Sequence, residues 1–234
     1  DLNGEKLTEL PLSFNVINGD FNCSINNLES LNGAPKEVNG SFICNDNKLT
    51  SLKHGPKIVN GDFNCGINNL ESLKGAPKEV VNGSFLCNDN KLTSLKHGPK
   101  IVDGMYKCSF NKLKSLEGCP AYIYGDFICD HTGIKSFKGA PQYIKYEFSC
   151  YNNNIRTLKN CPKYDAIDLS YNPINEIFKL FIRQKRINNI IVSRTNINKE
   201  RELVEYFNEL DVIQKRGRAT VVVLDRLNYF LQDI

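Results

Sequence analysis

One stretch of this chain returns nearly unchanged further along, and that repetition limits the possible folds more than any other feature. Val38–Leu52 reads VNGSFICNDNKLTSL and recurs as Val81–Leu95 with one conservative change. A sister version, Val59–Leu73, lies between these copies, and further copies precede and follow them. A fixed repeat of about 20 residues indicates a solenoid, in which each coil buries its apolar face only against its neighbours.

Each coil carries the same residue types at the same positions, counted from a cysteine that returns every 21 or 22 residues. The seven cysteines of this column are Cys23, Cys44, Cys65, Cys87, Cys108, Cys129 and Cys150. Phe or Tyr stands two residues before each cysteine, Asn three after it, an aliphatic five after it and a proline twelve after it. Thr132 replaces the Asn in one coil, and Leu169 replaces the cysteine in a later one.

These positions predict how one coil folds. The two-residue step from the aromatic to the cysteine places both side chains on the inner side of a strand. The Asn of each coil can bond to backbone groups of neighbouring coils, which predicts an asparagine ladder. The proline- and glycine-rich return predicts turns and short irregular or 3₁₀ segments on the other side, with no room for long helices.

The pattern F-x-C-x-x-N-x-L-x-x-L resembles the leucine-rich repeat, with Phe and Cys at the two strand leucines. Ile167–Ile174 matches that family pattern most closely, and the resemblance covers roughly residues 7–177. It implies a right-handed coil with a parallel sheet on its concave side. The Gly-Ala-Pro and Asn-Gly elements depart from the family and indicate a variant form, similar to uncharacterised repeat proteins of bacteria and large phages. The expected fold class is therefore an α/β solenoid that is mostly β.

Three regions follow from these patterns. Residues 1–18 are expected to form an N-terminal capping coil with shortened spacing, and residues 19–173 the solenoid proper. Residues 174–234 lose the repeat and predict a small α/β cap over the open end. Within it we expect helices over 174–186, Lys199–Leu210 and Asp225–Leu231, and strands over Asn189–Ser193 and Thr220–Leu224.

Composition limits the setting more than the function. The net charge of +4 does not by itself point to nucleic acid, and no apolar run approaches the roughly 20 residues of a membrane span. One cysteine per coil reads as a buried column of free thiols, which predicts a reducing cytoplasm, or the host cytoplasm for a phage-encoded protein.

The surface of the predicted sheet offers the main candidate site. Outward positions of the early coils carry a repetitive polar and aliphatic surface, whereas the later coils vary and expose aromatic side chains. Exposed aromatics among polar groups are typical of protein-binding surfaces. The candidate partner-binding residues on the concave face are Lys107, Phe110, Ile128, Asp130, His131, Tyr151, Asp168 and Tyr171.

Catalysis, cofactors and metals have little support in the sequence. No C-x-x-C pair exists, and in Cys129-Asp-His131 a turn separates the two candidate metal ligands. The extra cysteines Cys119 and Cys161 replace a small alanine in the return, where structural filling is the simplest explanation. We therefore expect neither an enzyme nor a bound metal or cofactor.

The C-terminal segment suggests two alternatives to recognition by the sheet. Two basic clusters could contact nucleic acid or an acidic partner, although no stacking aromatics are interleaved with them, which argues against nucleic acid. The cap could instead dock the protein into a larger assembly. The cluster residues are Arg183, Lys185, Arg186, Lys215, Arg216 and Arg218.

Overall fold

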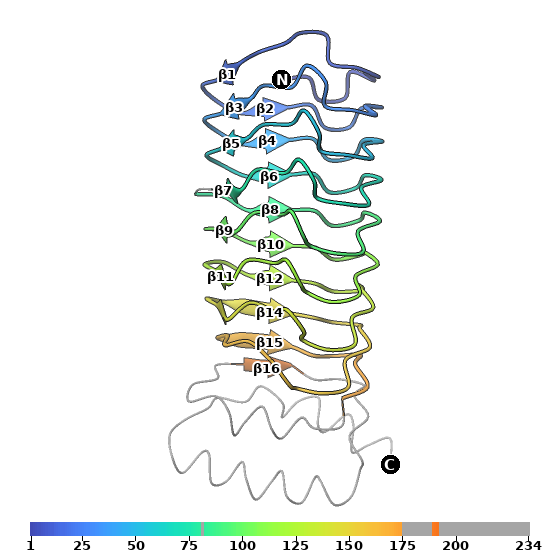
Figure 1. Ribbon diagram of the computed structural model, residues 1–234, viewed down its shortest axis with the longest axis vertical. Helices are drawn as coiled ribbons and strands as arrows, with labels where there is room; N and C mark the ends of the chain where they lie inside the picture. The colour runs from blue at the N-terminus through green and yellow to red at the C-terminus, as the bar shows by residue number, and fades with distance from the viewer. Residues whose placement is uncertain (81, 175–188, 192–234) are drawn as a thin grey trace, which may run out of the picture.

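The computed structural model describes residues 1–80 and 82–174, together with the backbone of 189–191, and every regular element in these ranges is a β-strand. The chain winds into a parallel β-solenoid whose coils are stacked along one axis (Figure 1). The repeat thus predicts the solenoid correctly. The expected helices start at residue 174 or later. Apart from Ile174 itself, they lie outside the described residues.

The main sheet contains one strand from each coil. Nine strands pair in parallel in the order β16-β15-β14-β12-β10-β8-β6-β4-β2. Each aromatic of the repeat is the register partner of the next, as in Phe42↔Phe63 and Tyr106↔Phe127. The strands are β2 (Phe21–Asn22), β4 (Phe42–Ile43), β6 (Phe63–Asn64), β8 (Phe85–Leu86), β10 (Tyr106–Lys107), β12 (Phe127–Ile128), β14 (Glu147–Ser149), β15 (Ala166–Asp168) and β16 (Asn189–Ile191).

A second parallel ladder runs beside the main sheet, where we expected only turns and irregular or 3₁₀ segments. Each coil forms a two-residue strand with a buried aliphatic, such as Val38 or Ile123, just before the Asn-Gly-type turn. The ladder is split into β1-β3-β5 and β7-β9-β11-β13, and β7 lies within the one 22-residue interval, between Cys65 and Cys87. The strands are β1 (Val16–Ile17), β3 (Glu37–Val38), β5 (Ile58–Val59), β7 (Glu79–Val80), β9 (Ile101–Val102), β11 (Tyr122–Ile123) and β13 (Tyr143–Ile144).

The core consists of columns that run along the solenoid axis. Phe42 and Phe63 are fully buried, and their rings stack with centroids 5.5 Å apart. The seven repeat cysteines are fully buried free thiols, flanked by the aliphatic columns. Every coil supplies the same few side chains at equivalent positions, so the stacking of coils on one another buries the core.

The predicted asparagine ladder is confirmed. The Oδ1 atom of Asn47 accepts the Leu28 amide at 2.9 Å, and its Nδ2 atom donates to the Cys23 carbonyl at 3.0 Å, both in the preceding coil. The same side chain also donates to the Cys44 carbonyl of its own coil at 3.2 Å. Each Asn therefore satisfies buried backbone groups that the turn after the strand leaves unpaired.

The first coil does not have the shortened spacing that we expected. Leu2 donates its amide to the Asn22 carbonyl as Cys23 does to the Ile43 carbonyl, so Leu2 occupies the cysteine position. Leu7 in turn accepts the Asn27 amide, the role of the aliphatic five residues after a cysteine. At the other end the predicted strand is confirmed for Asn189–Ile191, which pairs with β15 in the main sheet.

Candidate functional site

Four outward residues form one column on the main sheet. Lys107 pairs in register with Ile128, Ile128 with Ser149, and Ser149 with Asp168. Three of these four are predicted site residues, so the structure places them on neighbouring coils. Their coils, those of Cys108, Cys129, Cys150 and Leu169, are called the late coils below, and those of Cys23, Cys44, Cys65 and Cys87 the early coils.

Four aromatic rings form a second column beside the first, at the edge where the main sheet turns. The Phe110 ring stacks on His131 with centroids 4.5 Å apart and an interplanar angle of 17°. His131 contacts Tyr151 at 5.3 Å, and Tyr151 contacts Tyr171 at 4.8 Å. This ring column, Phe110–His131–Tyr151–Tyr171, spans all four late coils and joins four of the predicted site residues.

The turn after each strand explains why these side chains lie outside. Phe110, His131 and Tyr171 have φ angles of 54°, 54° and 58°, in the left-handed region that bulky residues seldom adopt. The equivalent residues of other coils share this conformation, with Ile25 at 54° and Asp46 at 55°. The buried ladder Asn, or Thr132 in the case of His131, follows directly, and its bonds to the backbone hold the turn in place.

Four carboxylates lie on or beside the strands of the late coils, and one of them, Asp130, bonds to the backbone of the ring column. Oδ1 of Asp130 accepts the Ser149 hydroxyl at 2.6 Å and the Tyr151 amide at 2.9 Å. Burial raises the pKa of the Asp130 carboxyl, and the charge of Asp168 adds to this, against the lowering effect of those two hydrogen bonds. Burial also raises the pKa of Glu147, followed by the charges of Asp126, Asp168 and Asp130. We call Asp126, Asp130, Glu147 and Asp168 the carboxylate group.

The thiols are poorly suited to nucleophilic chemistry. Burial raises the pKa of Cys129 well above its usual value, so it stays protonated near neutral pH. Cys119 is half-buried, and its thiol donates to the Gly139 carbonyl. Burial raises the pKa of this thiol to about 12. In the part of the chain that the structure describes, no cluster of three or more His, Cys, Asp or Glu residues could hold a metal ion.

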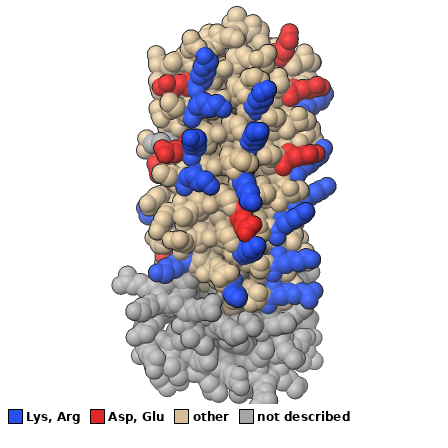
Figure 2. All heavy atoms as spheres, in the orientation of Figure 1, with Lys and Arg blue, Asp and Glu red and all other residues tan. Residues whose placement is uncertain are grey.

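Two further surface features were missed by sequence reasoning. Exposed tyrosines gather on the second ladder and its turns, at exposures between 37% and 50%. We call Tyr122, Tyr124, Tyr143 and Tyr146 the tyrosine patch. Lysines recur at equivalent positions of the return and form continuous rows (Figure 2). The repeated Pro-Lys and Pro-x-Tyr pairs in the sequence indicate both features. The sequence did not show that these lysines and tyrosines lie on the same side of the solenoid.

The remaining sequence predictions lie beyond the described residues. The basic clusters at 183–186 and 215–218 fall outside them, as does the rest of the expected cap. Within 1–80, 82–174 and 189–191, no helix is long and apolar enough to cross a membrane.

Comparison with known proteins finds no matching family model, no matching curated protein and no matching solved structure. The structure itself shows a repeat β-solenoid of turns about 21 residues long, with an asparagine ladder and stacked phenylalanines.

Proposed function

We propose that this protein is a non-catalytic scaffold that recognises a protein partner through the main sheet face of its late coils. In this proposal the solenoid is a variant of the leucine-rich-repeat type, the main sheet is its concave side, and the setting is a reducing cytoplasm. The observation that carries the proposal is the ring column, four aromatic side chains in continuous contact on one edge of the sheet.

The charged and aromatic residues on this face indicate which residue types a partner segment should carry. Asp130 of the carboxylate group bonds the Tyr151 amide, and Lys107 is the one basic residue in the neighbouring column of four. Arginine and lysine side chains pair with carboxylates and also lie favourably over aromatic faces. We therefore propose a segment of the partner that bears basic residues beside apolar ones.

The scaffold holds this surface in one arrangement before binding. Asp130 is fixed by Ser149 and by the Tyr151 backbone, and Asp168 accepts the Ser170 amide at 2.8 Å. Side chains that are already ordered lose little conformational freedom when a partner binds. A rigid surface of this kind favours selective recognition over adaptability.

Removing the rings tests the site directly. The triple variant Phe110→Ala, Tyr151→Ala and Tyr171→Ala should lose partner capture from lysate of the source organism by at least tenfold, because aromatic anchors dominate interfaces. The matched control changes Ile25, Ile67 and Asp89 to Ala at the equivalent turn position of other coils and should leave capture unchanged. Circular dichroism and thermal unfolding verify that both variants fold.

Equal recovery by the wild type and the ring variant would rule out this site. Attention would then move to the C-terminal segment, where the alternative assembly role would operate, and removal of residues 192–234 would abolish capture.

The carboxylate group also predicts how capture depends on pH. The raised pKa values of Asp130 and Glu147 mean that both lose their charge at a higher pH than ordinary carboxylates. Capture should be complete above those pKa values and weaken as the pH falls through them. Asp130→Asn keeps an oxygen to accept the Tyr151 amide and should flatten this dependence. A pH profile that is identical in wild type and variant would contradict the role of Asp130.

A further inference from the structure

Two rows of lysine run along the return side of the early coils, away from the main sheet. One row follows the proline of each early coil, and the other stands nine residues after Cys44, Cys65 and Cys87. All seven side chains are exposed. We call them the lysine rows, and they comprise Lys36, Lys57, Lys78 and Lys100 in the first row and Lys53, Lys74 and Lys96 in the second.

The backbone fixes the spacing of both rows. In the first row the Lys57 amide donates to the Lys36 carbonyl at 2.8 Å, and the Lys100 amide to the Lys78 carbonyl at 2.7 Å. In the second row Lys53 donates its amide to the Ser51 hydroxyl at 3.1 Å, and later members repeat this turn. Successive lysines are therefore separated by the rise of one coil, about 4.8 Å.

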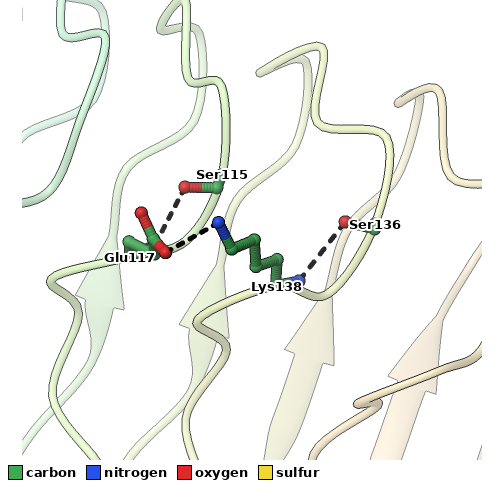
Figure 3. A network of polar contacts seen from close by, with 4 residues as sticks. All are labelled: Ser115, Glu117, Ser136 and Lys138. Carbon is green, nitrogen blue, oxygen red and sulfur yellow. Dashed lines mark hydrogen bonds and ion pairs between the residues drawn. The ribbon is translucent and has the colours of Figure 1, made fainter.

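The charges of the rows are not neutralised within the part of the chain that is described. The one ion pair there joins Lys138 to Glu117 at 3.0 Å in the late coils, where Glu117 takes the place of a lysine of the second row (Figure 3). Glu37 and Glu79 follow Lys36 and Lys78 in sequence but form no ion pair with them. Seven closely spaced cations against three carboxylates, Glu37, Glu79 and Glu117, leave a positive strip (Figure 2).

The first lysine row leads into the tyrosine patch. Lys100 is followed by Ile101 on β9, and the next strands place Tyr122 and then Tyr143 at the same outward position. Tyr124 and Tyr146 are exposed beside them, and the Lys145 ammonium lies 4.9 Å from the Tyr146 ring centroid. Cations and exposed rings thus share one side of the solenoid.

We propose that the lysine rows and the tyrosine patch together bind a single-stranded nucleic acid without regard to its sequence. Phosphates of the strand contact the lysines, which act as point charges, and unpaired bases stack on the tyrosine rings. A duplex would use the lysines but would hide the faces of its bases, leaving the tyrosines without a role. An acidic polysaccharide lacks planar bases and is an alternative outcome of the test.

This site is independent of the proposed protein-binding face, because none of its residues belongs to the ring column or the carboxylate group. The basic clusters at 183–186 and 215–218 are a competing source of affinity for nucleic acid. The test must therefore separate the lysine rows from those clusters.

Fluorescence anisotropy of a labelled oligothymidylate of about 20 nucleotides, titrated with the full chain, measures the interaction. The variant Lys57→Gln, Lys74→Gln, Lys78→Gln and Lys96→Gln should bind at least tenfold more weakly. It should also reduce the slope of log affinity against log salt by about 3, since each phosphate contact on a single strand contributes about 0.7. The matched control changes Lys48, Lys91, Lys112 and Lys135 to Gln and should retain most of the affinity and slope.

The double variant Tyr122→Thr and Tyr143→Thr keeps strand-forming residues and removes two rings. It should weaken binding by about tenfold without changing the salt slope, because stacking does not release ions. Equal losses in both lysine variants, equal or tighter binding of a duplex, or no effect of the tyrosine variant would each overturn the proposal. So would heparin binding that matches the oligonucleotide, or loss of binding only when Arg183, Lys185 and Arg186 are changed to Gln.

Discussion

The early and late coils have the same backbone plan but differ in how regular their interiors are. Phe21, Phe42, Phe63 and Phe85 stack in sequence with interplanar angles of 7°, 20° and 11°. Tyr106 then tilts by 38° against Phe85 and lies edge-on to Phe127 at 73°. The asparagine ladder is also continuous through the early coils and is interrupted at Thr132.

This difference in the interior is accompanied by a difference in the outward residues of the two halves. The early coils repeat the same core side chains and the same ladder asparagine. Their outward residues repeat as well, and this repetition produces the lysine rows. The late coils keep enough of that pattern to fold, and their outward residues are free to differ. The ring column and the carboxylate group both lie in these coils, where the repeat is least strict.

The largest effect should come from breaking the ladder inside the early coils. Asn68 accepts the Leu49 amide at 2.9 Å and donates to the Cys44 carbonyl at 3.1 Å and the Cys65 carbonyl at 3.3 Å. Asn68→Ala leaves these buried groups unpaired and should lower the free energy of unfolding by about 3 kcal/mol. Equilibrium unfolding in urea measures the change.

The matched control is Asn60→Ala. Asn60 also stacks on an Asn of the preceding coil, donating to the Asn39 side chain at 3.1 Å, but it is exposed. It should change stability by less than about 0.5 kcal/mol. A similar loss at both positions would show that burial does not decide the strength of the ladder.

A smaller change should make a late coil resemble an early one. The Tyr106 hydroxyl is fully buried and has no hydrogen-bond partner among the described residues; the nearby thiols, such as Cys87, are weak acceptors. Tyr106→Phe removes this polar group and restores the residue found in the early coils. It should stabilise the fold by about 1 kcal/mol in thermal or urea unfolding.

Tyr122→Phe is the reference for that prediction, because its hydroxyl is exposed on the second ladder and donates only to Gln142 at 3.2 Å. It should leave stability nearly unchanged. If Tyr106→Phe were instead destabilising, the Tyr106 hydroxyl would have to form a bond worth more than its desolvation.

The inward-facing columns could be predicted from the sequence, because each column repeats one residue type at a fixed position of the coil. Phe42, Cys44 and Asn47 repeat with a fixed offset, and the physical roles of a buried ring, a buried thiol and a buried amide follow from that. The outward candidates were also identified by position. Their contacts were not predicted, because Phe110 and His131 stand two residues after the cysteine whereas Tyr151 stands one after it.

The second ladder was missed for a different reason. Its strands are two residues long, and Glu37–Val38 or Ile101–Val102 shows no alternation extensive enough to indicate a strand. Only the stacking of coils gives them partners. The repeat already aligns the lysine rows in the sequence, but only the second ladder shows that they share one side of the solenoid with the tyrosine patch. The first coil was misjudged because Leu2 stands where the repeat has a cysteine.

A change of similar size to that of Tyr106→Phe concerns the interruption of the ladder. The Thr132 hydroxyl shares its one hydrogen between two acceptors, the Cys129 carbonyl of its own coil at 3.0 Å and the Asn153 Oδ1 atom at 2.8 Å. Among the described residues, no side chain gives the buried Leu113 amide the bond that Asn111 gives Leu92 at 2.9 Å. Thr132→Asn should supply this bond and raise the free energy of unfolding by about 1 kcal/mol.

Thr132→Val separates the two contributions, because it keeps the shape of threonine and the amide bond to Asn153 and removes the hydroxyl contacts. It should lower stability, whereas Thr132→Asn should raise it, relative to the wild type in urea unfolding. If Thr132→Asn fails to stabilise, the Asn153 contact of Thr132 is worth as much as a ladder bond. The late coils would then be adapted to the interruption, and the difference from the early coils would be a second stable arrangement of the ladder and not a defect in the first.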